Sequence, residues 1–134
     1  MISGFATPEG TKNFTAKHDS IPEKNFNVFR DLNLSNVGIG TYLGNPDSDT
    51  DNMVKNAVKK SVLAGVNVID TAINYRAQKA ERSVGQAISE LVNENKISRD
   101  EIFISTKNGY VTNDGDIQED LMQYVMRELG KPGI

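Results

Sequence analysis

Residues 66–75 read Val-Asn-Val-Ile-Asp-Thr-Ala-Ile-Asn-Tyr, and their first half is typical of a buried parallel strand: short, apolar and β-branched, with Gly65 before it. Alternation along this strand predicts two faces, one with Val66, Val68 and Asp70 and the other with Asn67, Ile69 and Thr71. A carboxylate that ends a parallel strand lies where α/β proteins place their chemistry. Asp70 is equally well explained as an N-cap or Asx-turn residue that closes the strand. Tyr75 follows in the loop above the strand tip.

The residues before this strand predict a helix and an earlier strand. Positions 47–51 are acidic and polar, which favours a helix start, and apolar residues recur at helical spacing from 53 to 64. Strand, helix, glycine and strand in this order predict a right-handed βαβ unit. The run Gly-Ile-Gly-Thr-Tyr at 38–42 lacks side chains on one face, because Gly38 and Gly40 lie two residues apart. Such a face admits a bulky group close to the backbone, although turn glycines explain it as well.

The residues after Tyr75 predict a second unit of the same kind. A polar loop at 76–80 leads into a helical pattern at 81–94, and Ser98 and Glu101 have the spacing of a capping box. A strand is predicted at 102–106 and ends on Lys107, with Phe103, Ser105 and Lys107 on one face. A loop at 108–116 precedes a third helical pattern at 117–129.

The N-terminal quarter of the chain is the least patterned part. Residues 1–25 are polar, rich in Gly, Thr and Pro, and without periodicity, so we predict a flexible, loosely held arm. Alternating residues at 26–30, a turn at 32–33 and the run 34–39 predict an N-terminal hairpin, or one hairpin strand followed by the first strand of the sheet.

Composition narrows the class of protein. The chain has 134 residues, of which 37% are hydrophobic and 25% charged, so one globular domain is expected. A net charge of -3 argues against nucleic-acid binding, and no apolar run is long enough to cross a membrane. The absence of cysteine excludes a disulfide or thiolate site and fits a reducing cytoplasm, where we expect the protein. We predict no metal site.

Asp70 and Lys107 end successive predicted strands. If the strands are parallel neighbours, the two tips lie about 5 Å apart and the carboxylate and ammonium form a partly buried pair. Tyr75 can then fold over the pair, and the nearby ammonium stabilises the phenolate, so that the phenol becomes a better proton donor. The simpler interpretation is a salt bridge between two strand ends with Tyr75 packed on top.

Four motifs, in this order along the chain, resemble the aldo-keto reductase family: Gly-Ile-Gly-Thr-Tyr at 38–42, Ile-Asp-Thr-Ala-Ile-Asn-Tyr at 69–75, Glu81 with Val84 and Gly85, and Ile-Ser-Thr-Lys at 104–107. The resemblance runs from about residue 26 to 107. Arg76 stands where most members of the family have a glycine after the tyrosine. In this respect the sequence resembles a branch of the family with an elaborated loop at this point.

The resemblance implies a parallel (β/α)8 TIM barrel that reduces carbonyls with NADP(H), possibly NAD(H). It implies that Tyr75 is the general acid, that Lys107 assists it, and that Asp70 pairs with Lys107 near the nicotinamide ribose. Gly40, Thr41 and Tyr42 match the segment that lines the nicotinamide end of the cofactor. The family's catalytic histidine has no counterpart here, because the only histidine, His18, lies in the N-terminal arm and is assigned no catalytic role.

A complete barrel needs roughly 200 residues or more, and this chain offers about three β/α units. Residues 26–134 are therefore expected to be the N-terminal part of an NADP(H)-dependent aldo-keto reductase that reduces aldehydes or ketones, inactive as this chain alone. The first alternative is a non-catalytic, reductase-like cofactor-binding or regulatory subunit. The second is a lyase-type barrel in which Lys107 forms a Schiff base.

The expected partners follow from the same argument. Three strands cut from a barrel leave two unpaired edges, and an inner face with Val66, Val68 and Phe103 that further strands would cover. We therefore expect the chain to pair with the remainder of its barrel or to self-associate, and to meet a small-molecule carbonyl substrate, with neither nucleic acid nor membrane as a partner.

Overall fold

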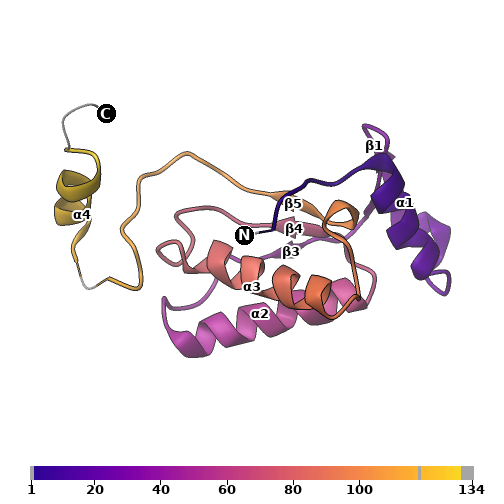
Figure 1. Cartoon of the computed structure of the whole chain (residues 1–134), viewed down its shortest axis with the longest axis horizontal. Helices are drawn as coiled ribbons and strands as arrows, with labels where there is room; N and C mark the ends of the chain where they lie inside the picture. Colours follow the sequence, from indigo (N-terminus) through magenta and orange to yellow (C-terminus); the bar gives the residue numbers. More distant parts are fainter. Residues whose placement is uncertain (1, 118, 131–134) are drawn as a thin grey trace.

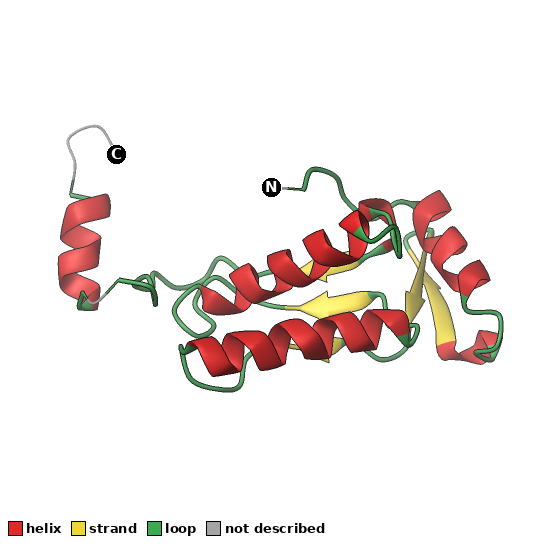
Figure 2. Ribbon diagram, turned by 60° about the horizontal axis from the view of Figure 1, so that its bottom comes forward, coloured by secondary structure: helices red, strands yellow, loops and turns green. Residues whose placement is uncertain are grey.

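The computed structural model describes residues 2–117 and 119–130 (Figure 1). A parallel sheet of three strands, in the order β3-β4-β5, lies against two helices, α2 and α3, and an antiparallel hairpin, β1-β2, stands at one end (Figure 2). The predicted parallel α/β architecture is confirmed. The strands that the described residues form do not close into a barrel. Of the segment predicted to be barrel, residues 118 and 131–134 lie outside the described ranges, as does Met1 of the predicted arm.

The strands of the parallel sheet are short. They are β3 (Ile39–Gly40), β4 (Val68–Asp70) and β5 (Phe103–Ser105), and β4 lies in the middle. Ile69 faces Ile39 on one side and Ile104 on the other, and Asp70 lies between Gly40 and Ser105. Because all three strands are parallel, their carboxyl ends meet at one edge, as the βαβ prediction requires.

Helices α2 (Ser48–Leu63) and α3 (Lys79–Asn93) lie side by side on one face of the sheet (Figures 1 and 2). Asp47 is the N-cap of α2 and accepts a hydrogen bond from the Thr50 amide at 2.7 Å. That backbone contact is the main cause of the lowered Asp47 pKa. Helix α3 carries its apolar residues on one stripe, as predicted, and packs them into the core.

The two faces of the sheet differ in burial, as alternation predicts. Ile69, Asn67 and Thr71 point toward the helices and are buried. Val68 and Asp70 lie on the opposite face and are only half-buried. The core therefore lies between the sheet and the helices, and consists of these buried residues: Phe14, Val58, Val62, Ile69, Val84, Ala87, Ile88, Leu91, Ile97 and Ile102.

The prediction of a loosely held arm is wrong for residues 8–17, which form helix α1 (Pro8–Lys17). Thr7 caps the helix by accepting from the Gly10 amide at 2.9 Å, and Pro8 occupies the first helical position. Phe14 is completely buried in the core. Gly10 fits against the Asp100 backbone, where an added Cβ would lie 2.4 Å from the carbonyl oxygen. The helix was missed because it buries few side chains and most of its residues are polar.

The expected N-terminal hairpin is present, as β1 (Phe26–Phe29) and β2 (Leu32–Ser35), and β3 is a separate strand. The predicted turn at 32–33 is wrong, because those residues already belong to β2, and the predicted run 34–39 is divided between β2 and β3. Arg30 and Asp31 form its two-residue turn, and both have positive φ angles of 47° and 66°. Asn67, which is fully buried, accepts from the Ser35 amide at 2.8 Å and donates to the Asn33 carbonyl at 2.9 Å. Asn67 thereby attaches the hairpin to the amino end of β4.

The remaining elements are short. They are the 3-10 turns η1 (Glu23–Asn25) and η2 (Arg99–Glu101) and the helix α4 (Leu121–Glu128), which begins after the N-cap Asp120 rather than at the predicted residue 117. Figure 1 shows α4 away from the sheet, at the end of the extended loop that follows β5.

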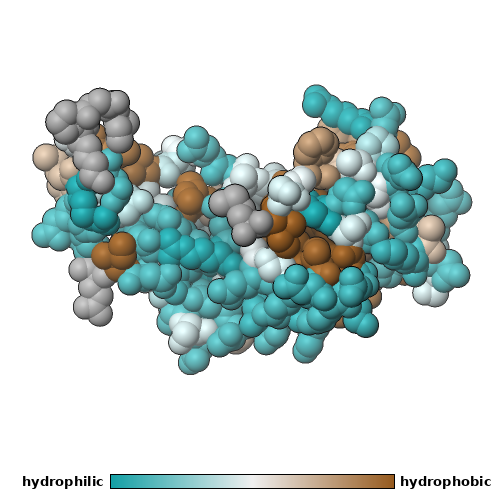
Figure 3. Space-filling view, viewed as in Figure 1, coloured by the Kyte–Doolittle hydropathy of each residue, from teal (hydrophilic) through white to brown (hydrophobic). Residues whose placement is uncertain are grey.

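In Figure 3, polar residues cover the lower edge, where α2 lies, and hydrophobic residues gather in the middle of the face. Within the described ranges, no helix combines the length and apolar character needed to span a bilayer.

Candidate active site

Asp70 and Lys107 meet at the carboxyl edge of the parallel sheet. The Lys107 ammonium donates to Asp70 Oδ1 at 2.8 Å, to Asp70 Oδ2 at 2.7 Å and to the Thr71 carbonyl at 3.0 Å. Strands β4 and β5 are neighbours in register, which brings the two tips together as predicted. Both side chains of the pair are 46% exposed, because nothing in the described structure covers this face of the sheet.

Tyr75 lies beside this pair, in the turn that follows β4. The Lys107 ammonium is 4.8 Å from the centroid of the Tyr75 ring, within the range of a cation–π contact. On its other side the ring makes an edge-to-face contact with Tyr42, with centroids 5.0 Å apart and an interplanar angle of 71°. Asp70 and Tyr75, which are close in the sequence, therefore form one cluster with Lys107, which lies more than thirty residues later.

The charge state of Lys107 follows from its neighbours. Hydrogen bonding to Asp70, and then to Tyr75, raises the pKa of Lys107 above its usual value. The ammonium form is thereby favoured at neutral pH. A lysine that forms a Schiff base must lose its proton before it attacks a carbonyl. The raised pKa of Lys107 therefore argues against the lyase alternative. It suits a lysine that acts as a fixed positive charge beside a phenol.

The three residues expected to line the cofactor have different surroundings. An added Cβ on Gly40 would meet no atom within 4 Å, so the backbone there is open to an approaching group. Tyr42 is 65% exposed and presents its ring at the same edge. Thr41 is instead buried, and its backbone amide and hydroxyl both donate to the Asp70 carbonyl at 3.1 Å. Thr41 thus holds the end of β4, while Gly40 and Tyr42 remain accessible.

Three consecutive non-glycine residues after Tyr75 have positive φ angles: Arg76 (49°), Ala77 (52°) and Gln78 (73°). Such conformations cost about 1–3 kcal/mol each and persist only where surrounding contacts fix them. We call residues 76–78 the left-handed turn. It leads directly into α3, whose first amide groups donate to the carbonyls of Tyr75 and Arg76.

A chain of alternating charges surrounds the left-handed turn. Asp51 pairs with Arg76 and Lys79, Asp116 pairs with Lys79 and Arg82, and Asp114 pairs with Arg82. We call these six residues the ion-pair chain. It connects α2 and α3 to the loop after Lys107, where the Gly115 amide also donates to the Ala77 carbonyl at 2.8 Å. Sequence reasoning noted Arg76 as a departure from the family but did not assign these contacts. The acidic first turn of α2 and the paired aspartates at 114 and 116 were the available signals.

His18 lies at the other end of the sheet. Its ring contacts Phe14, with centroids 4.5 Å apart, and borders Gly65, which precedes β4. This position suits the assignment of no catalytic role. No group of three or more possible metal ligands of the His, Cys, Asp and Glu types occurs among the described residues.

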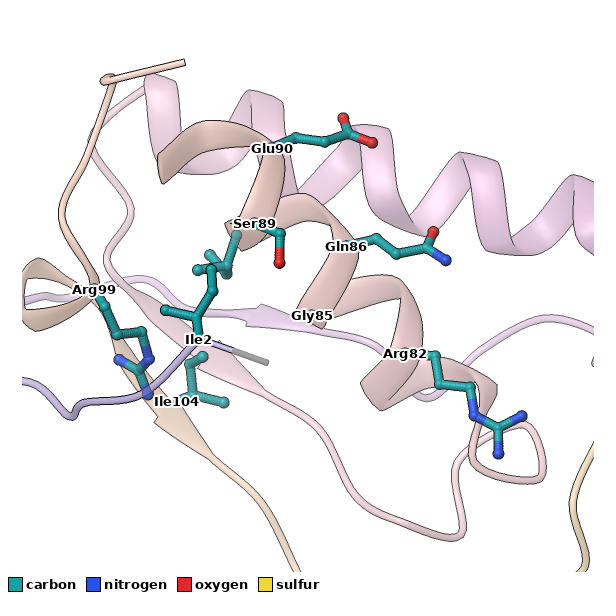
Figure 4. Close-up of a pocket in the computed structure, with 9 residues that line it drawn as sticks. Ile2, Arg82, Gly85, Gln86, Ser89, Glu90, Arg99 and Ile104 are labelled. Atoms are coloured by element: carbon teal, nitrogen blue, oxygen red, sulfur yellow. The ribbon is translucent and has the colours of Figure 1, made fainter. Parts of the chain in front are cut away.

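A pocket of about 670 Å³ lies on α3 and β5, away from Asp70 and Lys107. Figure 4 shows Ile2 and Ile104 at one side of it, and Gly85 and Ser89 on the facing turns of α3. Its walls are mostly apolar, and the Tyr75 cluster contributes none of its lining residues. The pocket and the Tyr75 cluster are therefore separate features of the surface.

Comparison with known proteins identifies the family. Residues 36–130 match the model of the aldo/keto reductase family. The chain is 32% identical, over 99 residues, to "Aldo-keto reductase AKR2E4" of Bombyx mori, an alignment that covers 73% of this chain and 30% of that protein. It is 33% identical, over 86 residues, to "NADH-specific methylglyoxal reductase" of Escherichia coli (strain K12), covering 60% of this chain and 24% of that protein.

The matched regions thus make up only 30% and 24% of the length of these two curated relatives. The family match includes β3, β4 and β5 and every residue of the Asp70, Tyr75 and Lys107 cluster. The order of motifs, the parallel sheet and the match over most of the sequence agree, and the chain belongs to the aldo/keto reductase family.

Proposed function

We propose that this chain is the N-terminal part of a (β/α)8-barrel oxidoreductase that reduces aldehydes or ketones to alcohols, with Tyr75 as the proton donor. The observation that carries the proposal is the Lys107 ammonium, which is bonded to both Asp70 oxygens and lies 4.8 Å from the Tyr75 ring. This arrangement supplies a phenol, a positive charge beside it, and a counter-ion that holds the charge in place.

The residues of the chain account for the proton half of the reaction. When a carbonyl is reduced, its oxygen gains negative charge and takes a proton from the Tyr75 hydroxyl, which becomes a phenolate. Lys107 stabilises that phenolate electrostatically, and Asp70 keeps the lysine charged and in place. The Tyr42 ring, in contact with Tyr75, limits the orientations of the phenol.

NADP(H), or NAD(H) as the second choice, supplies the hydride to the carbonyl carbon when it is bound. The residues at the strand tips fit a flat ring: Gly40 leaves open space beside the backbone, and Tyr42 offers an exposed aromatic face. Asp70 presents a carboxylate at the same edge, able to accept hydrogen bonds from a ribose. Thr41 would act indirectly, by holding the Asp70 backbone.

The open face of the sheet is proposed to be covered by the remaining strands of the barrel or, without them, by a second copy of the chain. Val68 and Phe103 lie on this face and are half-buried. The pocket on α3 and β5 is apolar and is proposed to receive the helix that follows the next part of the barrel. Without those parts, we propose that the 134-residue chain alone does not turn over carbonyls, and that its cellular location is the cytoplasm.

The proposal is tested with the complete barrel and a panel of aldehydes and ketones. Tyr75→Phe removes the proton donor and keeps the ring, so we expect turnover to fall about 10²-fold or more while cofactor affinity changes little. Stopped-flow measurement of NADPH oxidation, together with a fluorescence titration of the cofactor, separates the two quantities. Tyr110→Phe is the matched control, because Tyr110 is 76% exposed in the loop after β5.

Unchanged turnover in Tyr75→Phe would exclude Tyr75 as the acid. The non-catalytic alternative, a reductase-like cofactor-binding subunit, has one observation in its favour: the only histidine of the chain, His18, lies far from the strand tips. Cofactor binding by the complete barrel without turnover of any carbonyl in the panel would establish that alternative.

A further inference from the structure

Arg76 follows the proposed proton donor directly, yet its own side chain points away from the strand tips. The side chain is 1% exposed, which makes it the most deeply buried charge among the ion pairs of the described residues. A buried guanidinium is costly unless it is paired and hydrogen-bonded. The buried Arg76 side chain therefore requires hydrogen-bond acceptors within the protein. An arginine exposed to solvent would not, because water would solvate it.

Those partners come from both helices that cover the sheet. Arg76 Nη1 donates to Asp51 Oδ1 of α2 at 2.7 Å, and Nη2 donates to Ser83 Oγ of α3 at 3.0 Å. Ser83 in turn donates to the Lys79 carbonyl at 2.8 Å, which fixes the orientation of its hydroxyl. The planar fork of arginine spans the two acceptors, a geometry that a single ammonium cannot reproduce.

The backbone on either side of Arg76 is fixed as well. The Tyr75 carbonyl accepts from the Ala80 amide at 3.3 Å, and the Tyr75 amide donates to the Ala72 carbonyl at 3.1 Å. Arg76 itself has a φ of 49°, an uncommon conformation for a residue with a side chain. Rotation of this residue back to the ordinary region would redirect the backbone of Tyr75. The guanidinium contacts to α2 and α3 oppose that rotation.

We propose that Arg76 is a positioning residue for Tyr75: its guanidinium ties the left-handed turn to α2 and α3 and so holds the Tyr75 ring between Tyr42 and Lys107. This role rests on the proposed function of Tyr75, but the geometry that it predicts can be measured without turnover. Both terminal nitrogens of the guanidinium are bonded, to Asp51 and Ser83, and the side chain is buried, so it does not face a ligand; among the described residues its Nε has no hydrogen-bond partner.

The test uses nuclear magnetic resonance of the complete barrel and reads the position of the Tyr75 ring. Two signals report it: cross-peaks between the Tyr42 and Tyr75 rings, and the upfield ring-current shift of the Lys107 side-chain protons next to the ammonium. Arg76→Met keeps an unbranched stem that replaces the inner part of the arginine side chain and removes the fork, so we expect both signals to be lost. Arg76→Lys should restore them only in part, because one nitrogen cannot span Asp51 and Ser83.

Lys59→Met is the matched control. Lys59 also bridges α2 and α3, through Glu90 at 2.8 Å and Glu94 at 2.9 Å, but it lies far from the turn. This variant should keep both signals, which shows that loss of a cross-helix ion pair alone does not move Tyr75. Unchanged amide resonances of Asn67 and Ile102 establish that the core of each variant remains folded.

Retention of both signals in folded Arg76→Met would overturn the proposal, as would full restoration by Arg76→Lys. Should Arg76→Met not fold, Ser83→Ala decides: it removes one acceptor and keeps the Asp51 pair, so the signals should weaken, and unchanged signals would refute the role. A complete barrel that shows the expected ring geometry without any reductase activity refutes the proposed function and leaves the positioning result standing.

Discussion

The two ends of the parallel sheet are held together by different kinds of interaction. At the amino end, Phe14 and Ile102 are completely buried. Asn67 is also completely buried, and its side-chain amide forms neutral hydrogen bonds with the hairpin. At the carboxyl end, Asp70 and Lys107 are each 46% exposed, and the ion-pair chain lies around them. The amino end is therefore mostly apolar, with the Lys17–Glu101 pair as its ion pair, whereas charged contacts predominate at the carboxyl end.

This difference indicates a division of roles. Buried apolar contacts and satisfied buried hydrogen bonds supply most of the stability of a fold, whereas exposed ion pairs contribute little net free energy. The residues of the amino end therefore set the shape, and those of the carboxyl end are free to serve chemistry. Parallel α/β proteins show this division in general. Three substitutions or conditions test it here, from the largest expected effect to the smallest.

Phe14→Ala should produce the largest loss of stability. The ring is completely buried in the core between α1 and the sheet, and truncation of a buried phenylalanine costs about 3–5 kcal/mol. Chemical denaturation followed by circular dichroism measures the free energy of unfolding. Phe5→Ala is the control, because Phe5 is 74% exposed. Equal losses in the two variants would mean that α1 is attached loosely, as the sequence alone had predicted.

Lys107→Met should show the opposite balance, with little effect on stability and a large effect on turnover. The pair with Asp70 is half-exposed, so its removal should destabilise the chain much less than Phe14→Ala does. In the complete barrel, turnover should fall about 10²-fold and its pH profile should shift, because the phenol loses the neighbouring charge. Stability and the pH profile are measured on the same preparation. A destabilisation as large as that of Phe14→Ala would contradict the proposed division.

Acid should have the smallest of the three effects, and the loop after β5 provides a local measure of it. Arg82, followed by the Asp116 amide, lowers the pKa of Asp114 from 3.8 to about 2. A carboxyl with a lowered pKa stabilises the folded chain above its ordinary pKa, and this contribution is lost as the pH falls toward about 2. Hydrogen exchange of the Gly115 amide, corrected for its intrinsic rate, should therefore accelerate over this range. The loss of protection should disappear in Asp114→Asn; its persistence there would assign it to another group.

Much of the fold was predictable because it depends on local patterns. The alternation around Ile69 predicted which face of β4 is buried, and the apolar stripe with Val84 and Leu91 predicted α3. Helix α1 was not predicted, although Thr7 and Pro8 are start signals, because only one large apolar residue, Phe14, faces the core. A helix of this kind is fixed by tertiary contacts, which leave little trace in periodicity.

The meeting of Asp70 and Lys107 in the candidate site was predictable, but the contacts around them were not. Asp70 and Lys107 end successive strands, and parallel pairing alone brings such ends together. The partners of Arg76 could not be predicted, since Asp51 lies 25 residues earlier and the turn has positive φ angles without a glycine to signal them. Thr41 makes a contact that the sequence did not indicate, because its buried hydroxyl donates to the Asp70 carbonyl, and its expected place in the cofactor-lining segment stays a prediction.

The ion-pair chain has one more property, which concerns distance. It consists of three carboxylates, Asp51, Asp114 and Asp116, and three cations, Arg76, Lys79 and Arg82, so its formal charges sum to zero. Such an arrangement is strong at contact, but its potential decays quickly, and salt screens what remains beyond about 10 Å. It therefore offers no long-range attraction to an anionic molecule that diffuses toward the strand tips. The rate at which anionic molecules reach the strand tips should therefore depend on charges elsewhere in the protein. Changes in the ion-pair chain during evolution should leave that rate unaltered.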